Sequence, residues 1–138
     1  MRRMIDTLGI VEHHLQGISG RLHFVPPTDF LRNLPALIVE QAPPQVFSEN
    51  LPNAHHGAAS AVTLNAIAGS RAEAEALCLE AAQRLEDAVN VVTPKGWITR
   101  CVVSQLPHLA QHRYEKSTIF QYSAAVQLVF RQDPAAND

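Results

Sequence analysis

The sequence has no apolar run long enough to cross a membrane. No stretch approaches the roughly 18 consecutive apolar residues of a transmembrane helix. The N-terminal MRRMIDTLG has two arginines but no apolar segment behind them of the length found in secretory signal peptides. We therefore expect a soluble, cytosolic chain with no membrane partner.

A large excess of one charge is also missing. The 11 Lys and Arg residues nearly balance 13 Asp and Glu, which leaves a formal net charge of -2 at pH 7. The pI of about 6.4 shows no basic excess of the kind that indicates nucleic-acid binding. With 138 residues, of which 46% are hydrophobic, the composition predicts a single globular domain over residues 1–138 that needs no disulfide or metal.

The sequence lacks the common signatures of catalysis. It contains no G-x-S-x-G, no G-x-x-x-x-G-K-[ST] and no G-x-G-x-x-G motif, and carboxylates are sparse in the predicted strands. Its two cysteines stand in apolar surroundings, Cys78 in the stripe of a predicted helix and Cys101 within a predicted strand. Buried thiols are poor nucleophiles, so both are predicted to be reduced core residues. These absences predict a protein that is not an enzyme, with no catalytic residues and no cofactor.

Seven histidines raise the possibility of a metal site. His108 and His112 have the H-x3-H spacing of zinc ligands, but they fall in a predicted connection without a nearby Cys or carboxylate in a known ligand pattern. His55 and His56 lie in a long polar loop. We predict that these histidines are solvated and that the protein has no metal site. A small metal-dependent or ligand-binding enzyme that uses His108, His112 and His55 stays open as an alternative.

The pattern of apolar residues predicts two helices and four to five strands. The helices are expected at 5–19 and 70–89, where Ser70 and Glu73 have the spacing of a capping box. Strands are expected at 21–25, 36–40, 60–68, 97–106 and 117–132. This order, α-β-β-β-α-β-β, predicts an α+β fold in which two helices pack on one face of a single, mostly antiparallel sheet.

Two polar stretches interrupt this order. Residues 41–58, QAPPQVFSENLPNAHHGA, are predicted to form a long loop or arm in which QVF pairs briefly as a strand. Residues 132–138 are predicted to be a flexible tail.

The last predicted strand is about twice the usual length. In STIFQYSAAVQLVFRQ, apolar residues from Phe120 to Phe130 alternate with mostly smaller or polar ones over a dozen residues. This apolar face is expected to be too long for one small helix to cover. Proline and lysine, which commonly protect strand edges, are absent between Ile119 and Arg131. The face and the edge of this strand are therefore predicted to contact other subunits.

Other features also fit association. Ala72, Ala76 and Leu79 form a small-residue patch opposite the core stripe of the second helix, although alanine is also simply a good helix former. Trp97 begins a strand, where it would serve either as a core residue or as an interface anchor.

The order of elements resembles a known family. The most suggestive segments are SRAEAEAL at Ser70–Leu77, and Arg113 with Tyr114 ahead of AAVQLVFR at Ala124–Arg131. Over roughly residues 5–131, the chain resembles the tail terminator proteins of phages with long, non-contractile tails and of phage-like particles. These are also called tail completion or minor tail proteins.

The resemblance implies a structural virion protein that forms a hexameric ring. Such a ring caps the major tail tube protein, ends its polymerisation and offers a surface to a head-completion or neck protein. DNA passes through its channel without specific binding, and the family has no catalytic residues and no cofactor. The expected location is the tail or neck of the virion, with assembly in the host cytoplasm. A head–tail connector or other neck protein is the main alternative, and a stand-alone dimeric binding module is a further one.

The predicted interface residues lie in the polar arm, on the second helix and in the closing hairpin. They are Gln45, Phe47, His55, His56, Ala72, Ala76, Leu79, Trp97, Arg113, Tyr114, Phe120, Tyr122 and Val129.

Overall fold

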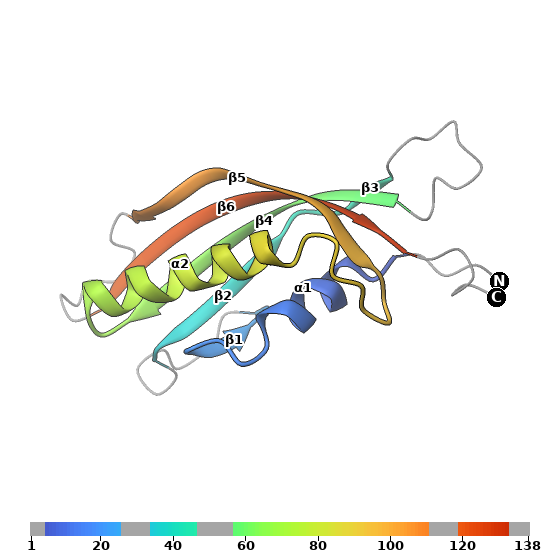
Figure 1. Ribbon diagram of the computed structural model, residues 1–138. Coiled ribbons are helices and arrows are strands. Elements are labelled where there is room, and N and C mark those ends of the chain that lie inside the picture. The colour runs from blue at the N-terminus through green and yellow to red at the C-terminus, as the bar shows by residue number, and fades with distance from the viewer. Residues whose placement is uncertain (1–4, 26–33, 47–56, 111–118, 133–138) are drawn as a thin grey trace.

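The computed structural model describes residues 5–25, 34–46, 57–110 and 119–132. Two helices and a sheet make up this part of the chain (Figure 1). In chain order the elements are α1 (Thr7–Leu15), β1 (Arg21–His23), β2 (Ala36–Gln41), β3 (Gln45–Val46), β4 (Gly57–Ala68), α2 (Arg71–Asp87), β5 (Trp97–Leu109) and β6 (Phe120–Arg131).

The sheet has the strand order β1-β2-β4-β6-β5, and the short β3 pairs with β4 beyond the end of β2. All neighbours are antiparallel except β1 and β2, which run parallel. The predicted α+β class and order of elements are confirmed. The two-residue β3 is the brief pairing expected for QVF.

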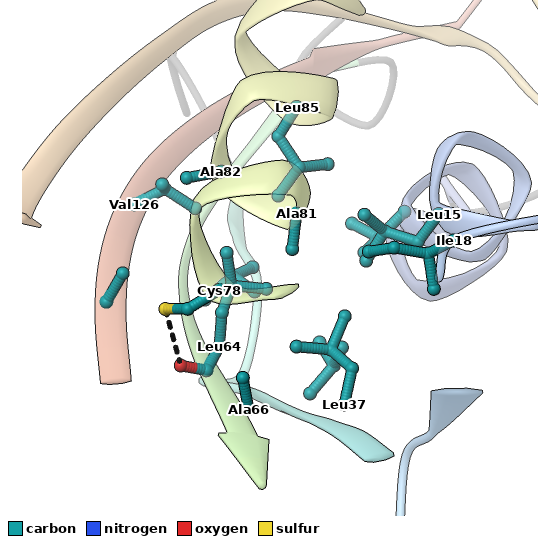
Figure 2. Close-up of a cluster of buried hydrophobic side chains, with 14 of the residues drawn as sticks. Leu15, Ile18, Leu37, Leu64, Ala66, Cys78, Ala81, Ala82, Leu85 and Val126 are labelled. Carbon is teal, nitrogen blue, oxygen red and sulfur yellow. Dashed lines mark hydrogen bonds between the residues drawn. The ribbon is translucent and has the colours of Figure 1, made fainter. Parts of the chain in front are cut away.

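Both helices cover the same face of the sheet (Figure 1). Side chains at alternate positions of β4 and β6 point toward them, because successive residues of a strand face opposite sides. Figure 2 shows Leu64 and Ala66 of β4 and Val126 of β6 packed beneath α2, with Leu15 and Ile18 on the other side of the cluster. This layer is the hydrophobic core that the helix and strand periodicities predict.

Helix α2 begins where the sequence predicts. The Ser70 hydroxyl accepts a hydrogen bond from the Glu73 amide at 3.2 Å, which satisfies one of the unpaired amides of the first turn. Farther along α2, Arg84 donates to the carbonyls of Gln16 and Gly17 at 2.6 and 3.1 Å. Since these carbonyls follow the end of α1, Arg84 ties the two helices together.

Helix α1 is shorter than predicted, because it ends at Leu15 and a turn follows in which Gly17 adopts a φ of +76°. At its start, the Asp6 carboxylate accepts from the Gly9 amide at 2.9 Å and pairs with Lys95 at 3.0 Å. These two contacts hold the pKa of Asp6 below its ordinary value. Val11 and Leu15 are fully buried, whereas Leu8, on the same apolar stripe, is 42% exposed.

The predicted long loop at 41–58 is shorter in the structure. Gln41 ends β2, Gln45–Val46 pair with β4, and Gly57 and Ala58 already belong to β4. Residues 47–56 lie outside the described residues. Of the predicted tail, Gln132 is buried, so the prediction is wrong at this position, and residues 133–138 also lie outside the description.

In the described part of the chain, neither helix combines the length and the apolar character needed to span a membrane.

Candidate assembly surface

Strand β6 is an inner strand, so the prediction that its edge is free is wrong. It pairs with β4 over all twelve of its residues and with β5 on its other side. Its backbone amides and carbonyls therefore meet strands on both sides, and another subunit has no edge of β6 to pair with.

The apolar face of β6 is also covered within the subunit. Val126 and Phe130 are fully buried, and Tyr122 is 4% exposed. The expected surplus of apolar surface is absent because α1 and α2 together cover the face that one helix would leave open (Figure 1). The predicted interface residue Tyr122 belongs to this core, and its hydroxyl accepts a hydrogen bond from Nε of Arg71 at 2.8 Å. Phe120, another candidate, is half-buried against the same core.

The strand with a free edge is β5. It is the outermost strand of the sheet, and among the described residues its outer side is paired only at its start, where Ile98 forms an isolated bridge with Val89. Three of its side chains are exposed large hydrophobics: Val102 at 42%, Leu106 at 75% and Leu109 at 43%. Backbone and apolar side chains are both available for contact here.

The edge of β5 is interrupted by irregular pairing. Its register against β6 shifts between Ile98 and Arg100, between Val103 and Gln105, and between Gln105 and His108. Such bulges bend a strand and limit uncontrolled edge pairing. The longest regular run between them is Arg100–Val103.

At each of these three register shifts, a polar side chain of β5 lies within hydrogen-bonding distance of a backbone carbonyl. The Thr99 hydroxyl donates to the Val129 carbonyl, and the Ser104 hydroxyl donates to the Ala125 carbonyl, both at 3.2 Å. At the third, Nδ1 of His108 lies 2.9 Å from the Leu106 carbonyl. The bulges are therefore specific features of β5 that the sequence encodes.

The histidines do not come together as metal ligands in the described residues. The exposed His108 bonds to its own strand, and His13 and His14 stack edge to face with ring centroids 5.2 Å apart. Among the described residues, no group of three or more His, Cys, Asp or Glu side chains is placed to hold a metal ion. The other proposed ligands, His55 and His112, lie outside the described residues.

A second free edge lies on the opposite side of the sheet. Strand β1 pairs with β2 only at Ala36–Ile38, so the outer edge of Val39–Gln41 has no strand partner among the described residues. A groove of about 510 Å³ opens at this edge. It is lined by Thr7, Leu8, Phe24, Val39, Glu40, Gln41, Ala42, Pro43 and Pro44.

Gln41 leaves one polar atom unpaired in this groove. Its side-chain amide donates from Nε2 to the Thr7 hydroxyl at 2.7 Å. Its Oε1 is buried and has no hydrogen-bond partner in the described structure. Because a buried acceptor without a donor is unfavourable by about 1–3 kcal/mol, the groove favours a ligand that supplies an N–H.

The sheet face away from the helices carries small, neutral side chains along its two central strands. Asn65 accepts from Gln121 at 3.1 Å and from Ser123 at 2.8 Å, which joins the two strands through an amide and hydroxyl network. The other side chains here are Ala59, Ala61, Thr63, Ile67, Ala125, Gln127 and Val129, with Arg131 at the end of β6. The middle of this face is therefore neutral, and its charged groups stand at the margins: Arg131, and Arg100 and Glu40 on the flanking strands.

The other candidate interface residues are distributed over several elements. The helix patch of Ala72, Ala76 and Leu79 is exposed, with Leu79 at 46%. Gln45 is exposed in β3, and Trp97 is half-buried at the start of β5 opposite Arg131. The structure does not join these positions into one surface. Phe47, His55, His56, Arg113 and Tyr114 lie outside the described residues.

Both cysteines are free thiols with suppressed acidity. Burial raises the pKa of Cys78 to about 12. Burial, assisted by Glu86, raises the pKa of Cys101 to about 11. Because the thiolate is the reactive form, neither residue is placed as a nucleophile.

Comparison with known proteins finds the same fold in a phage-like particle. The chain is similar to one in a solved structure described as the "Virion of native gene transfer agent (GTA) particle", with a TM-score of 0.57 and 16% sequence identity. The similarity covers 91% of this chain and 94% of that one. No family model matches the sequence, and no curated protein matches it either. At this level of identity, the likeness establishes a shared fold.

Proposed function

We propose that this chain is a structural virion protein, a tail terminator whose copies form a ring that caps the tail tube and ends its polymerisation. The observation that supports this most strongly is the fold shared with a chain of a gene transfer agent virion over nearly the full length of both. The resemblance of the sequence to tail terminators supports the same role independently of the fold.

The arrangement of free edges is compatible with a ring. A closed ring of identical copies needs two different contact surfaces on each copy, since each subunit touches two neighbours in the same head-to-tail sense. The outer edge of β5 and the free edge of β2 provide two such surfaces on opposite sides of one sheet.

The neutral sheet face is compatible with a DNA channel. Proteins bind DNA largely through Lys and Arg side chains that neutralise phosphates and release counterions. The middle of the two central strands presents Asn65, Ser123 and their small, neutral neighbours on this face, and the basic Arg131 and Arg100 stand at its margin. A ring lined by such surfaces would let DNA pass without holding it.

Assembly of particles in the absence of this chain tests the role directly. Particles are produced with and without this chain, and their tails are imaged by electron microscopy. A missing terminator leaves tube growth uncontrolled, so we expect headless tails of variable, often excessive length. Restoring the chain should return both the normal tail length and the attachment of heads.

The same images separate a terminator from a connector. If particles without this chain have tails of normal length that are detached from DNA-filled heads, the protein acts at the head side and is a connector or other neck component. Normal, complete particles without the chain would overturn both roles.

A further inference from the structure

We propose that copies of this chain join head to tail through their sheets, with the Arg100–Val103 run of β5 in one copy paired to the free Val39–Gln41 edge of β2 in the next. This inference rests on the proposed function, because it supplies the contact by which the ring forms. Arg100 and Glu40 lie on the same sheet face at this junction.

The two runs fit one another in length and in backbone chemistry. On β5, Arg100–Val103 is the longest stretch of regular pairing between bulges. On β2, the free stretch after the last pair with β1 spans Val39–Gln41. Neither run has a strand partner on its outer side among the described residues, and an extended strand is the ligand that satisfies such an edge.

Side-chain direction agrees with this register. Glu40 lies opposite Thr63 of β4, and Arg100 lies opposite Val129 of β6, so both side chains stand on the sheet face away from the helices. Side chains that pair across two strands must share a face. Both residues are exposed, and their charges are opposite.

The helix side of the junction is also complementary. Cys101 and Val103 project toward the helices and are only partly covered within their own subunit. The groove beside the β2 edge is lined on that side by apolar groups that include Leu8 and Val39. Pairing the strands would extend the hydrophobic layer from one subunit into the next. It would also bring backbone N–H donors to the edge where the Gln41 side-chain oxygen lacks one.

Charge and topology favour this head-to-tail pairing over a symmetric contact. Two β5 strands paired with each other would bring Arg100 near a second Arg100, and two β2 edges would bring together two Glu40 side chains. Like charges directly opposite each other destabilise a strand pair. A symmetric contact would also stop at a dimer, whereas the head-to-tail contact repeats and can close a ring.

Engineered disulfides test the contact. Glu40→Cys and Arg100→Cys are combined in a Cys101→Ala background, where the remaining Cys78 is buried. Within one copy, β4 and β6 lie between the two positions, and three strand spacings alone separate them by at least roughly 14 Å. This exceeds the span of a disulfide, so any cross-link joins different copies.

Mild oxidation should give the double variant a ladder of covalent oligomers on a non-reducing gel, ending at the size of the ring. Each single-cysteine variant should stay monomeric under the same conditions. Dimers from Arg100→Cys alone would show β5–β5 pairing and overturn the proposal. So would oligomers in native mass spectrometry without cross-linking in the double variant, or a wild-type protein that stays monomeric at high concentration.

Charge reversal supplies a second measurement. Glu40→Arg and Arg100→Glu should each weaken self-association several-fold, because exposed charge pairs contribute little individually. An equal mixture of the two variants should regain wild-type association, since every junction then joins opposite charges. A mixture no stronger than either variant alone would overturn the pairing. The tail-length experiment judges the terminator role separately, because a ring held by another contact would still cap the tube.

Discussion

Strands β5 and β6 are neighbours of similar length, with thirteen and twelve residues, yet they differ in almost every physical respect. In β6, residues alternate regularly between buried and partly exposed, and strands pair along both of its sides. In β5, the positions after Ile98 are exposed or half-exposed, three register shifts interrupt the ladder, and beyond Ile98 the outer side has no strand partner in the described structure.

The difference shows that the length and apolar content of a strand do not reveal its place in a sheet. A long apolar stripe, as in β6, belongs at the centre when helices lie over it. The mixed pattern of β5 belongs at the edge, where bulges and polar side chains such as Ser104 are tolerated and useful. The residues most available for assembly are therefore in the strand whose sequence pattern is less regular.

Replacing one leucine by alanine in each strand tests the difference between β6 and β5 most directly. Leu128 in β6 is 1% exposed, and Leu106 in β5 is 75% exposed. Leu128→Ala should lower the free energy of unfolding by about 2–5 kcal/mol, because it leaves a cavity in the core. Leu106→Ala should change it by no more than about 0.5 kcal/mol. Urea denaturation of the two variants measures both values, and equal losses would contradict the assignment of inner and outer strands.

Amide hydrogen exchange measures the difference between β6 and β5 in the wild-type protein, without a substitution. Amides of β6 between two paired strands should exchange only through opening of the whole fold. Amides at Ser104–Leu109, in the exposed half of β5, should exchange through local opening and on the order of 100-fold faster. Mass spectrometry or NMR on the wild-type protein at low concentration gives the rates. In an assembled ring, slower exchange confined to Arg100–Val103 would indicate that this run becomes paired.

Much of the fold was predictable from local sequence signals. The capping serine Ser70, the 3.6-residue apolar period of α2 and the two-residue period of β6 each depend on neighbours in sequence, and each is confirmed. The antiparallel pairing of β5 with β6 also followed from their closeness along the chain.

The candidate site was much less predictable, because it depends on contacts between distant segments. Nothing local to Tyr122 shows that a strand pairs on each side of β6 or that a second helix completes its cover. The free edge of β2 arises because β1 pairs with it only as far as His23, which lies opposite Ile38. The bulges of β5 did have a signal in the sequence. Thr99, Ser104 and His108 interrupt the apolar pattern of the strand at the places where its pairing with β6 shifts.

Thiol reactivity extends the comparison to the layer between the sheet and the helices, where one cysteine lies on β5 and the other on α2. Cys101 of β5 is half-buried beside Leu128, with a pKa of about 11, whereas Cys78 of α2 is fully buried, with a pKa of about 12. Since only the thiolate reacts, both should label slowly at pH 8, and Cys101 should react about tenfold faster or more. Rates with an aromatic disulfide reagent test this, with Cys101→Ala as the control. Faster labelling of Cys78 would mean that the layer beneath α2 opens more readily than the edge strand.

The smallest expected effects concern the hydroxyl groups at the bulges of β5. Thr99→Val keeps the side-chain shape but removes the part-buried hydrogen bond to the Val129 carbonyl, which should lower the free energy of unfolding by about 1 kcal/mol. Ser104→Ala removes an exposed bond to Ala125 and should lower it by a few tenths, roughly 0.5 kcal/mol or less, because water replaces the lost donor. Both values come from urea denaturation.

If the bulges exist to limit edge pairing, Thr99→Val should also increase irregular aggregation more than Ser104→Ala does, as light scattering would show. Unchanged aggregation in both variants would mean that the backbone, and not these hydroxyls, sets the irregular edge.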